Sequence, residues 1–395
     1  MIYLPAAFVA VSAALFFRSE SNVYAWSDAD IPDQAQRIYP KNFAVLDYVP
    51  PPTVANLSTQ FVPPGYTLEG LKNKPFHIYD EEFYAIIGSN PSLTLLAETN
   101  GDPLFHEAVA WYPPTDEVFF VQNAGAKAAG TGLQKSAITQ KIALSQVANV
   151  TASGERSVAG KVDVVTVDAN PAIVNPNGAT NYKGGLVFMG EGQGDNITSA
   201  IYYLHPEPPY NTTVLLNNYF GRQFNSLNDV AVSPRTKELY FTDVTYGYLQ
   251  DFRPTPGFPN QVYRFNEKTG LVSIAADGFN KPNGITFSPD GKYAYIADTG
   301  AGLGFYGNNQ TYPTTIYRFD VEDDGTWSGR KTFAYVTPGL PDGIHCDDKG
   351  NVYAGCGDGI QVWNPSGKLI GKIFIGETSA NFRESPLTTR LDLYR

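Results

Sequence analysis

Charged residues are scarce in this chain of 395 residues: they make up 17% of it, against roughly 25% in an average globular domain. Positive charge is the scarcer sign, because 28 Lys and Arg stand against 39 Asp and Glu and leave a net charge of −11. Such a surface repels phosphate backbones, so the composition argues against a nucleic-acid partner. The chain also lacks a G-x-S-x-G motif and a phosphate-binding glycine loop before a helix, which argues against a serine hydrolase and a nucleotide-binding fold.

Cysteine is equally scarce, with only Cys346 and Cys356 present. In a secreted chain the default expectation is one disulfide. The two residues flank a turn at 347–350 (DDKG), and a tight hairpin there would pair Cys346 with a residue near Val352. Cys356 would then lie several residues further along its strand, at about 3.3 Å per residue and beyond disulfide reach. We therefore predict two free thiols.

Long apolar runs are missing outside the amino terminus, so no membrane-spanning helix is expected beyond it. Residues 4–17 (LPAAFVAVSAALFF) have the length of a signal-peptide core, and residues 23–25 (VYA) form a small-x-small cleavage site. This predicts a signal peptide over 1–25 and a secreted protein, with an uncleaved anchor as the alternative because no Lys or Arg precedes the core. Five N-x-Ser/Thr sequons support export: Asn56, Asn149, Asn196, Asn211 and Asn309.

Turn formers and aromatic residues are abundant, with 37 Gly, 29 Pro, 25 Tyr and 24 Phe, a mixture that favours many short strands joined by turns. One pattern of strand, turn and strand recurs five times without gaps, starting at His106, Pro176, Leu227, Pro282 and Pro341. A further apolar strand follows, as in QVYRFN, TIYRFDV and IQVWNP. Repeat spacings of about 50 to 70 residues suit four-stranded propeller blades.

The predicted fold is therefore all-β: one six-bladed β-propeller domain over residues 40–395. A sixth blade would be assembled from the two chain ends, with candidate strands beginning at Lys368, Pro75 and Ser92. Beyond Asn381 the sequence alternates poorly and stops before a full hairpin. We expect either a short last blade or one left incomplete by a truncated end, which would leave the protein inactive.

The second position of each repeat carries a side-chain oxygen: Glu107, Asn177, Asn228, Asn283 and Asp342. Inner strands of a propeller begin near its axis, so these positions should converge on one point. Carboxylate and amide oxygens are the ligands that Ca²⁺ prefers, and the absence of His and Cys from the column argues against Zn²⁺. The alternative is that Asn and Asp before Gly are ordinary turn formers.

Over residues 76–372 the sequence resembles the senescence-marker-protein/gluconolactonase-like family of six-bladed propeller lactonases, and within it the fungal aldonolactone and pantolactone lactonohydrolases. The resemblance is carried by NNYFGRQFNSLNDVAVSP, LYFTDVTYGYLQDFRP, KPNGITFSPDGKYAYIADTG and LPDGIHCDDKGNVYAGCGDG. It implies a divalent cation, usually calcium, held by Glu107, Asn228, Asn283 and Asp342. In the related paraoxonases a His stands where this chain has Asn177.

We therefore predict calcium-dependent hydrolysis of a sugar-type or pantoyl lactone to its hydroxy acid, with another divalent cation as an option. A cation polarises the carbonyl, but calcium acidifies water weakly and a separate base is needed. Asp342 is the first candidate base, with pure ligation as its alternative. Glu191 is the second, with surface solvation as its alternative. The rival function is a secreted, non-catalytic propeller that binds a ligand or a protein.

Other residues are placed relative to the tunnel that would run along the axis of such a propeller. Asn177 and Asn228, together with Asp243 and Tyr246 at the end of a second strand, are predicted to contact substrate; for Asp243 and Tyr246 a solvent-facing turn is the alternative. Strand alternation places His106 and His345 on the opposite face from the ligand column, as packed residues or as residues that support the ligands from behind. His77 and His205 fall in outer segments. Neither the particular lactone nor the oligomeric state follows from the sequence.

Overall fold

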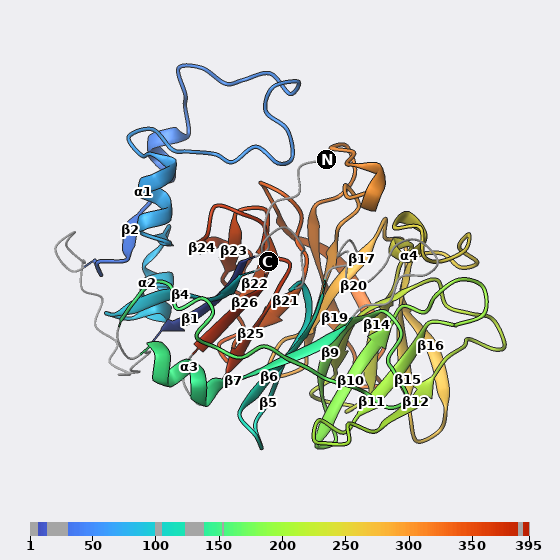
Figure 1. Ribbon diagram of the computed structural model, residues 1–395. Coiled ribbons are helices and arrows are strands. Elements are labelled where there is room, and N and C mark those ends of the chain that lie inside the picture. Colours follow the sequence, from blue (N-terminus) through green and yellow to red (C-terminus); the bar gives the residue numbers. More distant parts are fainter. Residues whose placement is uncertain are drawn as a thin grey trace.

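The computed structural model describes residues 7–13, 31–98, 105–122, 138–151, 154–385 and 390–394. Strands within these ranges form six antiparallel or mixed sheets, five with four strands and one with six (Figure 1). Helices α1 (Leu68–Asn73), α2 (Glu81–Ile87) and α3 (Leu144–Thr151) lie along one side of the sheets, and α4 (Tyr246–Leu249) lies near the other. None of the helices in the described ranges has the length and apolar character needed to cross a bilayer.

The first four repeats form four sheets of four strands each, in the order in which they occur along the chain. The first is β5 (Glu107–Tyr112), β6 (Glu117–Val121), β7 (Thr139–Ala143) and β8 (Val165–Thr166). The second is β9 (Pro176–Tyr182), β10 (Gly185–Gly190), β11 (Ala200–Leu204) and β12 (Thr212–Leu216). The third is β13 (Leu227–Val232), β14 (Leu239–Asp243), β15 (Gln261–Asn266) and β16 (Leu271–Ala276). The fourth is β17 (Pro282–Phe287), β18 (Tyr293–Asp298), β19 (Thr315–Val321) and β20 (Trp327–Tyr335).

The fifth repeat forms the six-stranded sheet. It contains β21 (Ile344–Cys346), β22 (Val352–Cys356), β23 (Gly359–Trp363) and β24 (Leu369–Phe374), extended by β3 (Phe76–Ile78) and β2 (Ala35–Arg37). Cys346 pairs with Val352 and Cys356 lies further along β22, so the prediction of two free thiols is confirmed. The strand expected at Lys368 to belong to the closing sheet is β24 of this sheet instead, because it pairs with β23 and β3.

The closing sheet joins the two ends of the chain in the order β25 (Asn381–Ser385), β26 (Arg390–Tyr394), β1 (Ala7–Ala13) and β4 (Pro91–Glu98). The two strands from the carboxyl end of the chain, β25 and β26, pair with each other in antiparallel fashion. The expectation of poor strand structure after Asn381 is therefore wrong. Of the predicted leader at 1–25, the structure describes only the backbone of β1. The remainder of that segment lies outside the described residues, and its cleavage stays a prediction.

The first strands of the sheets form a closed ring. β5 contacts β9, β9 contacts β13, β13 contacts β17, β17 contacts β21, β21 contacts β25, and β25 contacts β5. The prediction of an all-β propeller is confirmed, whereas six uniform four-stranded blades are not found. The apolar core lies between neighbouring sheets: Phe188 of β10 clusters with Phe119 of β6, and the adjacent Met189 clusters with Phe241 of β14. Strand alternation thus buries both faces of β10.

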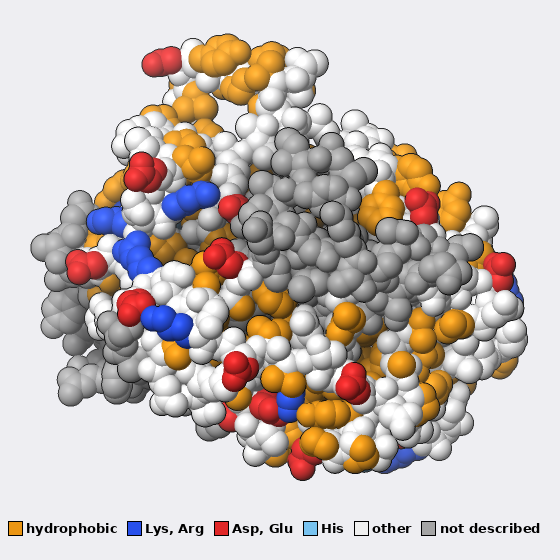
Figure 2. Space-filling view, viewed as in Figure 1, with side chains coloured by type: hydrophobic (Ala, Val, Ile, Leu, Met, Phe, Trp, Pro, Cys, Tyr) orange, Lys and Arg blue, Asp and Glu red, His pale blue; other side chains and the backbone are white. Residues whose placement is uncertain are grey.

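The segment between the short helix η2 (Pro40–Phe43) and α1 projects from the sheets (Figure 1). Hydrophobic side chains gather on it in Figure 2, among them the exposed Val45, Tyr48 and Val54. The carbonyl oxygen of Leu57 accepts a hydrogen bond of 2.7 Å from the backbone of Gly339, which ties the segment to the loop before β21. The sequon residues are exposed except Asn309, which is half-buried, and Asn149 lies in α3 rather than in a turn.

Packing of β3 on β24 makes stability depend on pH. His77 is 2% exposed, its ring stacks on Phe374 at 4.8 Å, and burial lowers the pKa of its imidazole to about 4. The unfolded chain, with a His pKa near 6.5, therefore binds the proton first as pH falls. This group's contribution, on the order of 3 kcal/mol, is present above about pH 6.5 and is lost as pH falls towards 4.

His77→Leu should accordingly flatten the slope of unfolding free energy against pH between 6.5 and 4, whatever its effect at neutral pH. Urea denaturation at several pH values, with a chelator present throughout, measures this slope. Identical slopes for the variant and the unsubstituted protein would show that His77 takes up its proton in the folded state, contrary to this expectation.

Candidate active site

A β-bulge recurs at the start of the first strand in the first four sheets. In each, four residues of the first strand lie opposite three residues of the second: Glu107–Ala110 against Phe119–Val121, with bulges of the same size starting at Pro176, Leu227 and Pro282. A bulge re-aims the side chains around it. The second position of each repeat thereby departs from strict strand alternation at the inner end of its sheet.

Glycine after the second position is needed for close packing between inner strands. A Cβ at Gly178 would lie 2.5 Å from the carbonyl oxygen of Asn228, and one at Gly284 would lie 2.2 Å from that of Asp342. At Gly343 it would lie 2.6 Å from the Asn381 side chain. The Asn-Gly and Asp-Gly pairs thus bring neighbouring strands together at the axis, and the alternative that they are ordinary turn formers is wrong.

Gly284→Ala tests this close approach. The added methyl group must displace the backbone at Asp342, so we expect a loss of unfolding free energy on the order of 1–3 kcal/mol and weaker metal binding. Gly257→Ala is the control, because its Cβ would meet only the end of Arg222, at 3.8 Å. Urea denaturation measures the unfolding free energy of both variants. Equal values would contradict the expectation.

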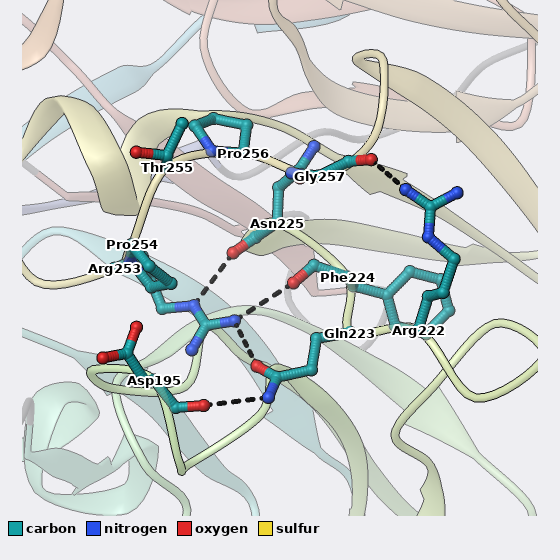
Figure 3. Close-up of a pocket in the computed structure, with 10 residues that line it drawn as sticks. All are labelled: Asp195, Arg222, Gln223, Phe224, Asn225, Arg253, Pro254, Thr255, Pro256 and Gly257. Carbon is teal, nitrogen blue, oxygen red and sulfur yellow. Dashed lines mark hydrogen bonds between the residues drawn. The ribbon is translucent and has the colours of Figure 1, made fainter.

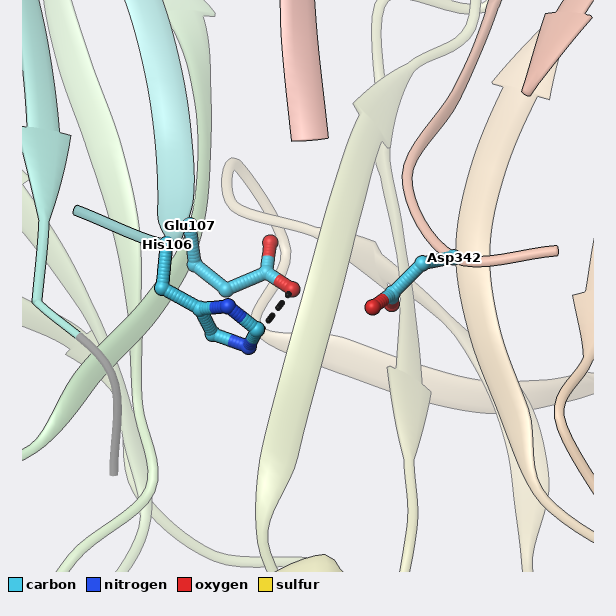
Figure 4. A group of neighbouring side chains, drawn as sticks. All are labelled: His106, Glu107 and Asp342. Carbon is cyan, nitrogen blue, oxygen red and sulfur yellow. Dashed lines mark ion pairs between the residues drawn. The ribbon is translucent and has the colours of Figure 1, made fainter. Parts of the chain in front are cut away.

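Glu107 and Asp342 face each other across the axis (Figure 4). One carboxylate oxygen of each, together with a ring nitrogen of His106, lie within 4.8 Å of one another. Glu107 is 5% exposed, and Nε2 of His106 lies 3.7 Å from its Oε1. Two carboxylates at this separation repel each other unless a cation or a proton lies between them.

The expectation that His106 lies on the opposite face from Glu107 is wrong. Its ring lies beside Glu107, with 27% of the side chain exposed. The physical reason is local: His106 precedes the first residue of β5, and Ala108 adopts a left-handed φ of 57°. Alternation of side chains holds only within regular extended backbone, and this stretch is not regular. His345 does pack as predicted, with its ring edge-on to Phe382 at 4.9 Å.

Buried oxygens without hydrogen-bond partners point to a cation. The Oδ1 atoms of Asn177, Asn228 and Asp342 are buried and accept no hydrogen bond from any described residue. A buried, unsatisfied acceptor costs about 1–3 kcal/mol, so three of them on one ring of positions need an explanation. All three are hard oxygen donors, and Asn283 and Glu107 occupy the remaining positions of the ring. This donor set fits a calcium-type divalent cation.

Electrostatics lead to the same conclusion. Burial, followed by the charge of Asp342, raises the pKa of Glu107 well above its usual range. Burial likewise raises the pKa of Asp342, while a hydrogen bond from the Asn283 side chain lowers it. Nearby positive charge therefore does not offset the cost of ionising either buried carboxyl group. A divalent cation between them would favour the ionised forms and bind with release of protons.

Asn381 is the site residue that sequence reasoning missed. It begins β25, is 5% exposed, and its Nδ2 donates a 2.7 Å hydrogen bond to Oε2 of Glu107. Its own Oδ1 accepts from the backbone of Phe382 at 2.7 Å. Asn381 thus holds Glu107 in place across the contact between the closing sheet and the first sheet. The repeat pattern ends before it, so only an in-register search of the last strand could have found it.

Glu191 lies directly after β10 and is 2% exposed. Its Oε1 accepts a 2.7 Å hydrogen bond from Oγ of Ser226, the residue before β13. The alternative of a solvated surface carboxylate is therefore wrong. Glu191 is not part of the cluster of Glu107, Asp342 and His106, although its charge contributes to the raised pKa of Glu107.

Asp243 holds a loop rather than facing the tunnel or solvent. It is fully buried and accepts hydrogen bonds from the backbone of Ser226 at 2.8 Å and of Asn225 at 3.1 Å. Burial raises the pKa of Asp243 to about 7 against these hydrogen bonds. Asp298 has the same role in the next sheet, where its Oδ1 accepts a 2.8 Å hydrogen bond from the backbone N–H of Lys281. Neither alternative predicted for Asp243 is found, and its contact with substrate is not supported.

Tyr246 begins α4 and is half-buried. Its hydroxyl lies 2.5 Å from Oγ1 of Thr299, which joins the loops that follow β14 and β18. Burial raises the pKa of Tyr246, and the charges of Asp342 and Glu107 add to this effect. The hydroxyl therefore lies within the electrostatic reach of the axial carboxylates. The predicted contact of Tyr246 with substrate stays a prediction.

The sheets form a closed propeller ring, and carboxylate and amide oxygens lie at its axis. The protein is therefore a propeller whose axial side chains are hard oxygen donors. The family model of the SMP-30/Gluconolactonase/LRE-like region matches residues 176–382. The chain belongs to this family, which confirms the resemblance seen in the sequence.

Relatives agree with this assignment, and solved structures agree with the fold. Lactonohydrolase oryL of Aspergillus oryzae is 29% identical over 332 residues, which cover 80% of this chain and 71% of that protein. A gluconolactonase from Xanthomonas campestris superposes with a TM-score of 0.61 at 22% identity, covering 81% of this chain and 95% of that one. The calcium-binding protein regucalcin from Agrobacterium tumefaciens superposes with a TM-score of 0.50 at 15% identity, covering 74% and 82%.

Proposed function

We propose that this chain is a lactonase that hydrolyses a sugar-type or pantoyl lactone to its hydroxy acid at the axial site, with calcium as its divalent cation. Membership of the SMP-30/gluconolactonase/LRE-like family and the similarity to a lactonohydrolase support the class of reaction. The observation that carries the proposal is the set of buried, unpartnered oxygens of Asn177, Asn228 and Asp342 beside Glu107. Such a set is costly without a cation and explained by one.

Glu107, Asn228, Asn283 and Asp342 would hold the cation, and Asn381 would fix the carboxylate of Glu107 by its 2.7 Å hydrogen bond. When bound, the cation supplies Lewis-acid polarisation of the lactone carbonyl. Asn177 and Tyr246 border the space left for the lactone ring. The hydroxyl groups of a sugar-type lactone match these polar side chains.

Asp342 is the proposed base. One of its carboxylate oxygens would bind the cation while the other accepts a proton from the attacking water. Asp342 takes a proton from the attacking water, the water oxygen bonds to the carbonyl carbon, and the acyl carbon–oxygen bond of the ring breaks. The proton then passes to the departing alkoxide oxygen, which leaves a hydroxy acid. A ring nitrogen of His106 lies within 4.8 Å of carboxylate oxygens of Glu107 and Asp342, and the charge of Glu191 contributes to the raised pKa of Glu107.

A pH-stat assay over a panel of aldonolactones and pantolactone, with calcium or with a chelator, tests the proposal. Calcium-dependent acid release supports it. The rival function, a secreted propeller that binds without turnover, predicts thermal stabilisation by calcium and no acid release from any lactone. Turnover that is unaffected by the chelator would leave a lactonase but remove the metal from its mechanism.

We also propose that the six-stranded sheet and the closing sheet serve as blades, which makes the ring six-bladed, and that the protein is secreted. Contact of β21 with β25 and of β25 with β5 supports the first part. Removal of residues 1–25 would take β1 out of the closing sheet, so N-terminal sequencing of the secreted protein distinguishes a cleaved leader from a retained strand.

A further inference from the structure

A cavity of about 360 Å³ lies beside the loop that leads into β13 (Figure 3). Three loops enclose it: the loop after β10, the loop before β13 and the loop after α4. Its lining residues are Asp195, Arg222, Gln223, Phe224, Asn225, Arg253, Pro254, Thr255, Pro256 and Gly257. None of them belongs to the cluster of Glu107, Asp342 and His106.

The walls of the cavity are tied together by hydrogen bonds. Oδ1 of Asn225 accepts from the backbone of Gly257 at 3.0 Å and of Phe258 at 3.1 Å, and its Nδ2 donates to the Phe258 carbonyl at 2.9 Å. Nε2 of Gln223 donates to the carbonyl of Asp195 at 2.9 Å. All three loops are therefore fixed to one another, and the cavity is formed before any ligand enters. A preformed site loses less entropy on binding.

Two arginine side chains bring positive charge to the walls. Arg253 is 5% exposed, and its guanidinium donates to the carbonyls of Gly194 at 2.6 Å and Phe224 at 3.1 Å. Arg222 lies over the ring of Phe258 at 3.9 Å and donates to the Gly257 carbonyl. Neither arginine forms an ion pair with a described residue. The charges of nearby carboxylates, first that of Asp243, offset the charge of the buried Arg253, which leaves Arg222 as the cation available to a ligand.

Chemistry of the lining suggests a ligand with both a carboxylate and hydroxyl groups. Arg222 is exposed, and the ring beneath it fixes the plane of its guanidinium, whose remaining N–H groups match a carboxylate. Asp195 is exposed across the cavity and can accept from a hydroxyl, as can the hydroxyl of Thr255. A neutral lactone carries no charge for Arg222 to bind.

We propose that this cavity is a binding site for a polyhydroxy carboxylate of the size of an aldonic acid. The choice of ligand rests on the proposed function, because such an acid is the product class of a sugar-type lactonase. The site is separate from the axial one, but the loop that lines it leads directly into β13, which carries the axial residue Asn228.

Isothermal titration with D-gluconate, with D-glucitol as the neutral polyol, tests the proposal on the full protein. We expect saturable gluconate binding that weakens as salt rises, and none for glucitol. Arg222→Gln should lower gluconate affinity about tenfold or more, because one charge-assisted pair is lost. Arg330→Gln is the matched control: its guanidinium also lies over a ring, Tyr317 at 3.9 Å, and donates to carbonyls, but outside the cavity.

Gluconate could also bind at the axial cation, so the titration is repeated on Glu107→Gln, where binding in the cavity should persist. Equal affinity of Arg222→Gln and Arg330→Gln, or binding lost only in Glu107→Gln, would overturn the proposal. Lactone turnover is measured on the same preparations. Absent turnover with intact, Arg222-dependent binding would overturn the proposed function and leave the cavity as a hydroxy-acid site.

Discussion

Glu107→Gln is expected to remove measurable calcium binding at the axial site and to lower kcat/KM for a lactone by about 10³-fold or more. The substitution keeps the shape of the side chain but removes one of the two facing carboxylates, whose oxygens lie within 4.8 Å of each other. The other ring members are amides and contribute no charge. Calcium affinity by isothermal titration and turnover by pH-stat measure the two effects together.

Glu117→Gln is the control for this change. Glu117 begins β6 in the same hairpin as Glu107, but its carboxylate pairs with Lys141 at 2.6 Å, away from the axis. It should bind calcium and turn over lactone like the unsubstituted protein. A Glu107→Gln variant with intact turnover would contradict the assignment of the axial ring as the active site.

Asp342→Asn should separate metal ligation from proton transfer. The amide keeps an oxygen at the position but loses one charge and the ability to take a proton. If Asp342 is the base, turnover stays depressed by on the order of 10²-fold even when saturating calcium fills the site. If Asp342 only binds metal, calcium affinity falls and turnover returns fully at saturating calcium.

Two further variants locate the base if Asp342 is not it. Glu191→Gln removes the carboxylate that accepts from Ser226, and His106→Gln removes the imidazole beside Glu107; neither should alter calcium affinity greatly. Full recovery of Asp342→Asn by calcium, combined with loss of turnover in Glu191→Gln or His106→Gln, would move the base to that residue.

Much of the fold was predictable because its hairpins are local. Each pairs two strands across a short turn, so alternation and turn residues define it within about 17 residues, and strands such as QVYRFN fall where expected as β15. The convergence of Glu107 and Asp342 was also predictable, since they occupy equivalent places in the repeats. The reason for the glycine after most column residues was not, because the contact at Gly284 is made to another sheet.

The remaining features depend on contacts distant in sequence. The hydrogen bond from Asn381 to Glu107 joins residues 274 positions apart, in a strand whose pattern is weak. The closing sheet combines β1 and β4 with the carboxyl-terminal hairpin. The predicted closing strand, β24, pairs with β3 in the six-stranded sheet instead. His106 was misplaced because alternation was extended through a bulge. Local sequence rules carry no information on pairings of this range.

If the proposed function is right, lactone turnover requires a cation held by the axial ring. Metal is removed with a chelator, and calcium binding and turnover are then followed together as calcium is restored. We expect one ion bound per chain at this site, turnover that rises in proportion to its occupancy, and neither effect in Glu107→Gln. Full turnover of the metal-free protein, or restoration of turnover by calcium in Glu107→Gln to the level of the unsubstituted protein, would contradict it.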